Sequence, residues 1–214
     1  WLFKLTELSR LSHFGYHGHY LRIDLETEQV TRVPLGAEVL RRYLGGSGLG
    51  TYLLLRENAA IHDSLAPEAA LVFAFSPLVG SPLTTSAKFA VVSKSPLTDR
   101  INDSLASSGF AIAGKQSGCD ALVLVGRARQ NSVLLLDDGR FELLPAQGLA
   151  GQGTNQTERM LRKQLGNDWQ IASIGPAGEN LVRYATISHA GRHAGRGGAG
   201  TVLGAKNLKA IAIR

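Results

Sequence analysis

The chain has 214 residues, 44% of them apolar, which suffices for one domain or two small ones with a sizeable core and excludes wholesale disorder. Glycine is frequent, at 25 residues, and 23 basic against 17 acidic side chains give a formal net charge of +6. The single cysteine, Cys119, excludes an internal disulfide framework, a cysteine-ligated zinc site and a full thiolate set for an iron–sulfur cluster.

The first half of the chain predicts an alternating hairpin, two short helices around a glycine-rich segment, and strands separated by a further short helix. In chain order, these elements are expected at 19–25 and 30–33 (hairpin), 37–44 and 51–58 (helices flanking Gly45–Gly50), 69–75 and 88–93 (strands), 107–116 (helix) and 121–125 (strand). The second half predicts a hairpin with an Asp-Gly turn, an amphipathic helix, two strands, a short helix and a last strand. Their ranges are 132–136, 140–144, 155–165, 171–174, 182–188, 200–206 and 210–213. Strands dominate this order and the helices are short, so the fold class is α+β and sheet-rich.

The two halves of the chain carry similar features in one order: a strand, a Pro/Gly turn, a basic-aromatic strand, a Gly/Ser loop, a short helix and a strand. The matching segments are 73–80 with 171–178, 88–92 with 183–187, and 109–124 with 200–213. Strand composition alone could produce such short matches, but four features in one order favour an internal repeat. A pseudo-twofold would place two basic strands and two glycine-rich loops on one surface, which suits a ligand with two similar anionic halves.

The whole net charge lies in residues 181–214, which hold six basic side chains and no acidic one. Within them, Gly191–Gly200 (GRHAGRGGAG) precedes a predicted helix. Glycines let backbone N–H groups approach a ligand, the helix start adds positive potential, and Arg192 and Arg196 can each grip a phosphate. The alternative is a solvated glycine-rich loop with two exposed arginines. Because the glycines, the helix start and the acid-free context coincide, the sequence favours an anion site.

The same region is also compared with the patterns typical of dinucleotide binding and of nucleic-acid binding. Gly195-x-Gly197-x-x-Gly200 matches the dinucleotide fingerprint, which makes an NAD(P)- or nucleotide-binding oxidoreductase domain the alternative function. That fingerprint needs a βαβ unit and an acidic residue roughly 20 positions later, but the final strand ends in Arg214 without one. Nucleic acid is not an expected partner, because Tyr184 is the only aromatic neighbour of these basic residues.

Three motifs resemble the N-terminal domain of the tungsten-containing aldehyde:ferredoxin oxidoreductases. They are Lys94–Thr98 (KSPLT), Ile174–Asn180 (IGPAGEN) and the long Gly195–Ile211 (GRGGAGTVLGAKNLKAI). The resemblance makes 15–214 a tungstopterin-binding N-terminal domain and leaves 1–14 as an extension outside it. It implies two pseudo-twofold-related β-sheets with short helices, which form the base for a tungsten (or molybdenum) bis-pterin. In the family, magnesium joins the two pterin phosphates.

By position, the resemblance implies cofactor contacts but no catalytic residue in this chain. The implied cofactor-binding residues are Lys88, Ser107, Arg192, His193, Gly195 and Gly197. Lys88 replaces a family arginine, Ser107 a loop glycine, and the backbone carbonyl of His193 would be a magnesium ligand. The family asparagine that binds magnesium aligns with Leu105, whose side chain cannot ligate a metal. A local shift could bring in Asn102 or Ser104.

The family reaction converts an aldehyde to a carboxylic acid and passes electrons through a 4Fe–4S cluster to ferredoxin. The cluster ligands belong to domains that this sequence lacks, so the chain is expected to be a fragment, a split subunit or a remnant, inactive alone. The remaining domains or subunit and, through them, ferredoxin are the expected partners, and association between copies of the chain is left open. Without a secretory signal or an apolar run of bilayer length, we expect a cytoplasmic location and no membrane partner.

Overall fold

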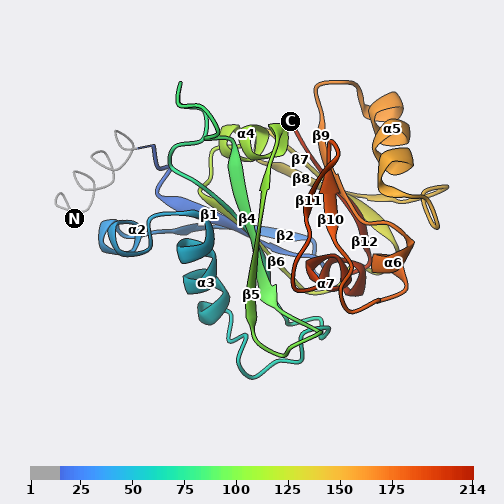
Figure 1. The fold of residues 1–214 in the computed structure, drawn as a ribbon, viewed down its shortest axis with the longest axis horizontal. Helices are drawn as coiled ribbons and strands as arrows, with labels where there is room; N and C mark the ends of the chain where they lie inside the picture. The colour runs from blue at the N-terminus through green and yellow to red at the C-terminus, as the bar shows by residue number, and fades with distance from the viewer. Residues whose placement is uncertain (1–14) are drawn as a thin grey trace.

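Two mixed six-stranded sheets frame residues 15–214, the part of the chain that the computed structural model describes (Figure 1). The predicted extension, 1–14, lies outside the described residues. The first sheet has the order β2-β1-β6-β3-β4-β5. Its strands are β1 His19–Asp24, β2 Gln29–Pro34, β3 Leu71–Phe75, β4 Lys88–Lys94, β5 Ile101–Ser107 and β6 Ala121–Val125. The sheet-rich α+β class is confirmed.

The second sheet repeats the arrangement of the first and has the order β11-β10-β9-β12-β7-β8. Its strands are β7 Ser132–Asp137, β8 Arg140–Pro145, β9 Gln170–Ser173, β10 Ile187–His189, β11 Arg192–Ala194 and β12 Leu208–Ile213. When six is added to each strand number of the first sheet, the order becomes β8-β7-β12-β9-β10-β11, which is the order of the second sheet read in reverse. In each sheet one pair is parallel, β1 with β6 and β7 with β12. The predicted repeat is confirmed, and it also includes the two hairpins.

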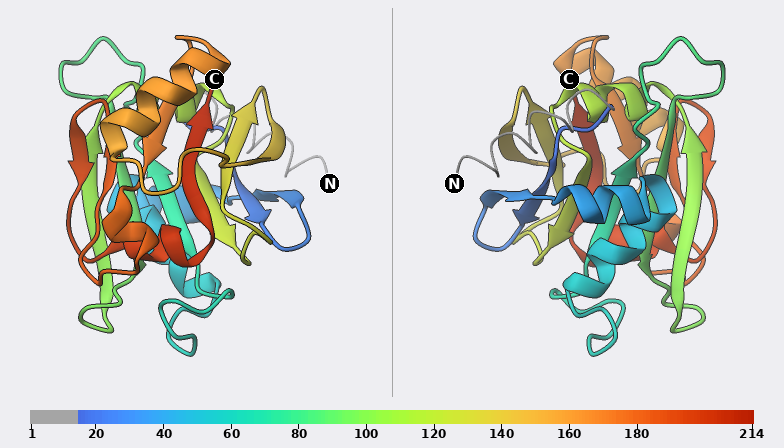
Figure 2. Two further views of the ribbon diagram at one scale, coloured as in Figure 1. Left: turned by 90° about the vertical axis from the view of Figure 1, so that its right-hand side faces the viewer. Right: turned by 90° about the vertical axis from the view of Figure 1, so that its left-hand side faces the viewer.

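Helices cover the sheets from outside and lie between them. They are α2 Ala37–Tyr43, α3 Gly46–Arg56, α4 Gly109–Gln116, α5 Thr154–Leu165, α6 Pro176–Glu179 and α7 Ala199–Ala205. Turned sideways, the molecule shows α5 on one outer side and α2 with α3 on the opposite one (Figure 2). The equivalent helices α4 and α7 each contact strands of both sheets. None of the helices in residues 15–214 has the length and apolar character that crossing a bilayer requires.

A central apolar cluster joins the two sheets. Phe73 and Phe89 of the first sheet and Ile211 of the second belong to it, together with Phe110 of α4 and Val202 of α7. Two outer clusters lie beneath α2 and α3 and beneath α5. Because both faces of the middle strands are covered, β3 and β6 are buried at every position and appear in the sequence as continuous apolar runs.

The predicted elements differ from the structure in four places, one of which is the short helix α6 at the predicted Pro/Gly turn. Two strands, β5 and β11, occupy segments that the sequence assigns to loops. The predicted strand over 182–188 is wrong for most of its length, because the chain turns there and β10 begins only at Ile187. The glycine-rich segment Gly45–Gly50 lies largely inside α3, where Gly50 lets the helix approach Val92 so closely that a Cβ would lie 2.5 Å from its Cγ2 atom.

Lys206, at the end of α7, is fully buried and solvates two backbone carbonyls. Its Nζ donates to the oxygens of Pro67 and Gly126, each at 3.1 Å. Burial, reinforced by the positive charge of Arg127, lowers the pKa of Lys206 to about 7. An unfolded lysine has a pKa near ~10.4, so between these values the unfolded chain binds a proton that the folded chain has released. This residue therefore makes the folded state more stable as pH rises from 7 to about 10.

We expect Lys206→Met to remove this pH dependence. The free energy of unfolding of the wild type, relative to that of the variant, should rise by up to about 1.4 kcal/mol per pH unit above pH 7, the value for one proton. Urea unfolding at pH 7, 8 and 9, followed by the fluorescence of buried Trp169, measures this difference. Parallel pH profiles for the two proteins would contradict the assignment.

Candidate functional site

The edge strands β5 and β11 lie side by side where the two sheets meet (Figure 1). They belong to separate sheets, so the surface between them is not closed by a continuous strand ladder. Two adjoining hollows, of about 400 and 630 Å³, open along this line and share Leu105 and His193. We call them together the β5–β11 hollow.

Most of the site residues expected from the sequence meet in this hollow. Lys88, Ser107, Arg192 and His193 line its smaller part, and His193 and Gly195 line its larger part. The β4–β5 pairing places Lys88 directly opposite Ser107. Residues from the two halves of the chain therefore face one another across the pseudo-twofold.

The hollow is positively charged. Lys88, Arg192 and Arg196 are exposed, and no ion pair within residues 15–214 engages their side chains. Free cations of this kind can neutralise a phosphate, and a guanidinium can hold it with two parallel hydrogen bonds. Asp103 also borders the larger part, but its carboxylate accepts a hydrogen bond from the Ser47 hydroxyl.

The loop after β11 is held in place by β5, the edge strand of the other sheet. The Asn102 side-chain amide donates to the Arg196 carbonyl at 3.1 Å, and the Arg196 N–H donates to the Ser104 hydroxyl at 3.1 Å. Gly197 does not line the hollow but packs on Asn102, and a Cβ there would lie 2.0 Å from the Asn102 Cγ. Asn102 and Ser104, considered above as magnesium ligands, thus use polar atoms to anchor this loop.

Close packing explains more of the glycine-rich segment than ligand approach does. A Cβ on Gly198 would lie 2.1 Å from the Arg183 carbonyl oxygen, and one on Gly200 would lie 2.4 Å from that of Thr186. Gly195 differs, because it lines the hollow and a Cβ there would have no atom closer than 3.9 Å. Gly191 also lines the hollow and would have no atom within 4 Å of a Cβ, so these two glycines leave open backbone at the hollow.

The segment around Gly195–Gly200 does not form the βαβ unit that the dinucleotide-binding alternative requires. Successive antiparallel pairings of β11 with β10, β10 with β9, and β9 with β12 make β11 antiparallel to β12. The segment from β11 through α7 to β12 is therefore not the parallel βαβ unit that holds a dinucleotide.

Burial shifts the pKa values of the Cys119 and His189 side chains. Cys119 is buried, as expected for a core residue, and burial raises the pKa of its thiol to about 11, so it is a poor nucleophile. His189 is the last residue of β10, where burial lowers its pKa and Nε2 lies 3.2 Å from the Gln170 Oε1. Residues 15–214 contain no group of three or more His, Cys, Asp or Glu side chains that could hold a metal ion. The exposed cations of the hollow suit it to binding an anion.

Sequence comparisons relate the chain to one family. The family model described as "Aldehyde ferredoxin oxidoreductase, N-terminal domain" matches residues 20–214. Tungsten-containing aldehyde ferredoxin oxidoreductases of Pyrococcus horikoshii and Pyrococcus furiosus are 41% and 40% identical, over 94% of this chain and 33% of each relative. An aliphatic sulfonate oxidoreductase, WOR-like subunit, of Pyrococcus furiosus is 33% identical over 92% of this chain and 34% of its own. The chain thus spans about a third of the length of these relatives.

The fold of the chain is also similar to that of a solved structure. The active-site complex BamBC of benzoyl-coenzyme A reductase, in complex with 1,5-dienoyl-CoA, matches with a TM-score of 0.90 at 32% sequence identity. The match covers 94% of this chain and 31% of that chain. The two-sheet repeat is therefore a unit that also occurs within a longer protein.

We expect the Gly197–Asn102 contact to couple the two sheets energetically. Gly197→Ala should lower the free energy of unfolding by about 1–3 kcal/mol, because the new Cβ meets Asn102 and the φ of +70° disfavours a side chain. Adding Asn102→Ala should relieve the clash but not the backbone strain, so the double variant should lose less than the sum of the single losses. Urea unfolding of the four proteins tests this, and strict additivity would contradict it.

Proposed function

The chain belongs to the aldehyde ferredoxin oxidoreductase family, as its N-terminal domain, and from that membership we propose that the β5–β11 hollow is the seat of a tungsten bis-pterin cofactor. The observation that carries the proposal is the convergence of Lys88 and Arg192, one from each half of the repeat, as exposed cations without ion-pair partners among residues 15–214. One cation from each half of the chain suits a ligand with two phosphorylated halves.

Each residue has a binding task in this proposal. Arg192 and Lys88 neutralise phosphate charge, the Ser107 hydroxyl donates a hydrogen bond, and the open backbone at Gly195 lets a ligand lie close to the chain. The metal–pterin supplies the redox chemistry, whereas this chain orients it and screens its charge.

The backbone carbonyl of His193 would hold a magnesium ion, which would neutralise phosphate charge. Magnesium prefers oxygen ligands and commonly takes only one or two from the protein, with the rest from phosphates and water. The exposed side chain of Leu105 cannot add a ligand, so a carbonyl site of this kind depends on the phosphates for most of its oxygens.

The larger enzyme is proposed to oxidise aldehydes to carboxylic acids and to pass the electrons to ferredoxin, with tungsten rather than molybdenum as in the names of the relatives. Its iron–sulfur cluster must be held by residues outside this chain, since the chain has one cysteine.

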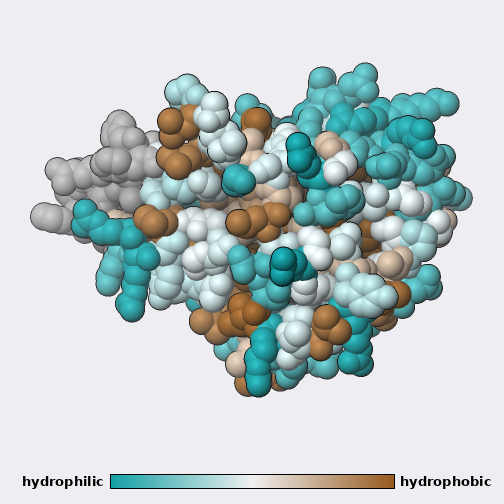
Figure 3. Space-filling view, in the orientation of Figure 1, coloured by the Kyte–Doolittle hydropathy of each residue, from teal (hydrophilic) through white to brown (hydrophobic). Residues whose placement is uncertain are grey.

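The face that carries β5 and β11 mixes polar and apolar side chains (Figure 3), and Leu97, Ile101 and Leu105 are exposed on or beside β5. This apolar surface supports burial against the remaining domains.

Replacing Arg192 should weaken cofactor retention. In the enzyme that contains this chain, Arg192→Ala should lower the amount of tungsten retained after dialysis by roughly ten-fold or more, because a charge-assisted phosphate contact is lost. Metal analysis per protein measures this. Arg32→Ala, an exposed arginine on β2, is the matched control and should retain wild-type tungsten. Wild-type retention in both variants would refute the role of Arg192.

The chain alone should not turn over. We expect no viologen-coupled oxidation of an aldehyde by the purified 214-residue chain alone, because its single cysteine cannot hold the iron–sulfur cluster of the proposed electron path. Sustained turnover under these conditions would overturn the proposed division of labour.

A further inference from the structure

The hairpin that carries Arg192 and His193 is short. β10 and β11 pair over only three residues each, and β10 pairs with β9 at a single position, Ser188 with Ser173. The turn consists of Ala190 and Gly191, which have positive φ angles of 46° and 72° and are both exposed. A hairpin of this size is marginal by itself, so its position depends on contacts with the rest of the molecule.

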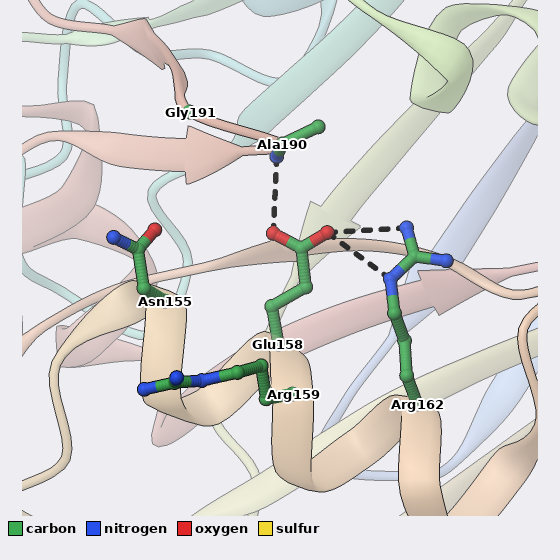
Figure 4. A pocket seen from close by; sticks show the side chains of 6 residues that line it. All are labelled: Asn155, Glu158, Arg159, Arg162, Ala190 and Gly191. Carbon is green, nitrogen blue, oxygen red and sulfur yellow. Dashed lines mark hydrogen bonds and ion pairs between the residues drawn. The ribbon is translucent and has the colours of Figure 1, made fainter.

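Helix α5 supplies such a contact from behind the turn. The Ala190 N–H donates to the Glu158 Oε2 at 3.0 Å, while the other carboxylate oxygen accepts from Arg162 at 3.2 and 3.1 Å (Figure 4). Arg162 in turn donates to the Asn167 carbonyl at 2.9 Å. The Glu158 carboxylate is thereby oriented by its own helix and directed at the turn.

The turn separates this contact from the proposed cofactor surface. A hollow of about 410 Å³ behind the turn is lined by Glu158, Arg162 and Gly191, among others, and Gly191 also lines the β5–β11 hollow. The helix itself is rigidly seated, because Leu161 is buried in the outer cluster of the second sheet. Displacement of the turn would therefore move Arg192 and His193 relative to Lys88 and Ser107 on the other sheet.

We propose that Glu158 is a positioning residue that holds the Ala190–Gly191 turn and so fixes the orientation of Arg192 and His193 toward the β5–β11 hollow. The inference rests on the proposed function of that hollow. Glu158 does not line the β5–β11 hollow, and its charge is balanced by Arg162, so it anchors the turn without repelling an anion in front of it.

Hydrogen exchange and tungsten retention together test this role in the enzyme that contains this chain. In Glu158→Ala, amides of residues 187–195 should exchange about ten-fold faster and tungsten retention should fall about ten-fold, because the charge-assisted anchor is lost. Glu158→Gln keeps one acceptor oxygen for the Ala190 N–H but loses the charge, so both readouts should fall between those of Glu158→Ala and the wild type. Lys163→Ala, an exposed change on the same helix, should alter neither. Alanine favours helix, so α5 amides should stay protected in all variants.

Unchanged exchange of 187–195 in Glu158→Ala would overturn the proposal, as would faster exchange with wild-type tungsten retention. Should the wild type itself retain no tungsten, the proposed function of the hollow fails, and the exchange rates alone then decide whether Glu158 holds the turn.

Discussion

The packing of two equivalent sheets around one apolar core is the constraint on which the rest of the structure depends. Side chains from both sheets and from the helices α4 and α7 meet in this core, so neither sheet can shift without opening it. Since the sheets share one strand order, equivalent edges meet, and β5 comes to lie beside β11. The candidate site is a consequence of that symmetry rather than of either half alone.

The same packing lets the site combine exposed charge with a fixed backbone. Lys88 and Arg192 remain open to solvent, while the segments around them are held by neighbours from elsewhere in the chain. Asn102 and Ser104 of β5 bind the backbone of the loop that follows β11. Glu158 of α5 accepts a hydrogen bond from the turn that precedes β11. A cationic surface with a rigid backbone can bind an anion without first ordering its loops, which lowers the entropic cost of binding.

Family membership relates this surface to enzymes that are about three times as long as the chain. The chain spans about a third of its relatives, and their names include an aldehyde oxidoreductase and an aliphatic sulfonate oxidoreductase. A shared N-terminal unit among enzymes whose names give different substrates fits the proposed role in seating the cofactor. Under the proposed function, substrate choice lies in the rest of the enzyme.

The sequence by itself determined the sheet-rich class, most strands and the repeat, because buried strands such as β3 and β6 are continuous apolar runs that can be recognised locally. It also indicated the family and the residues that converge on the hollow. It did not reveal β5 or β11, since one is a polar edge strand and the other has three residues, and neither carries a periodic apolar pattern. Only the tertiary structure decided how Asn102 holds Arg196, 94 residues away, because such contacts depend on sheet packing and leave no local trace in the sequence.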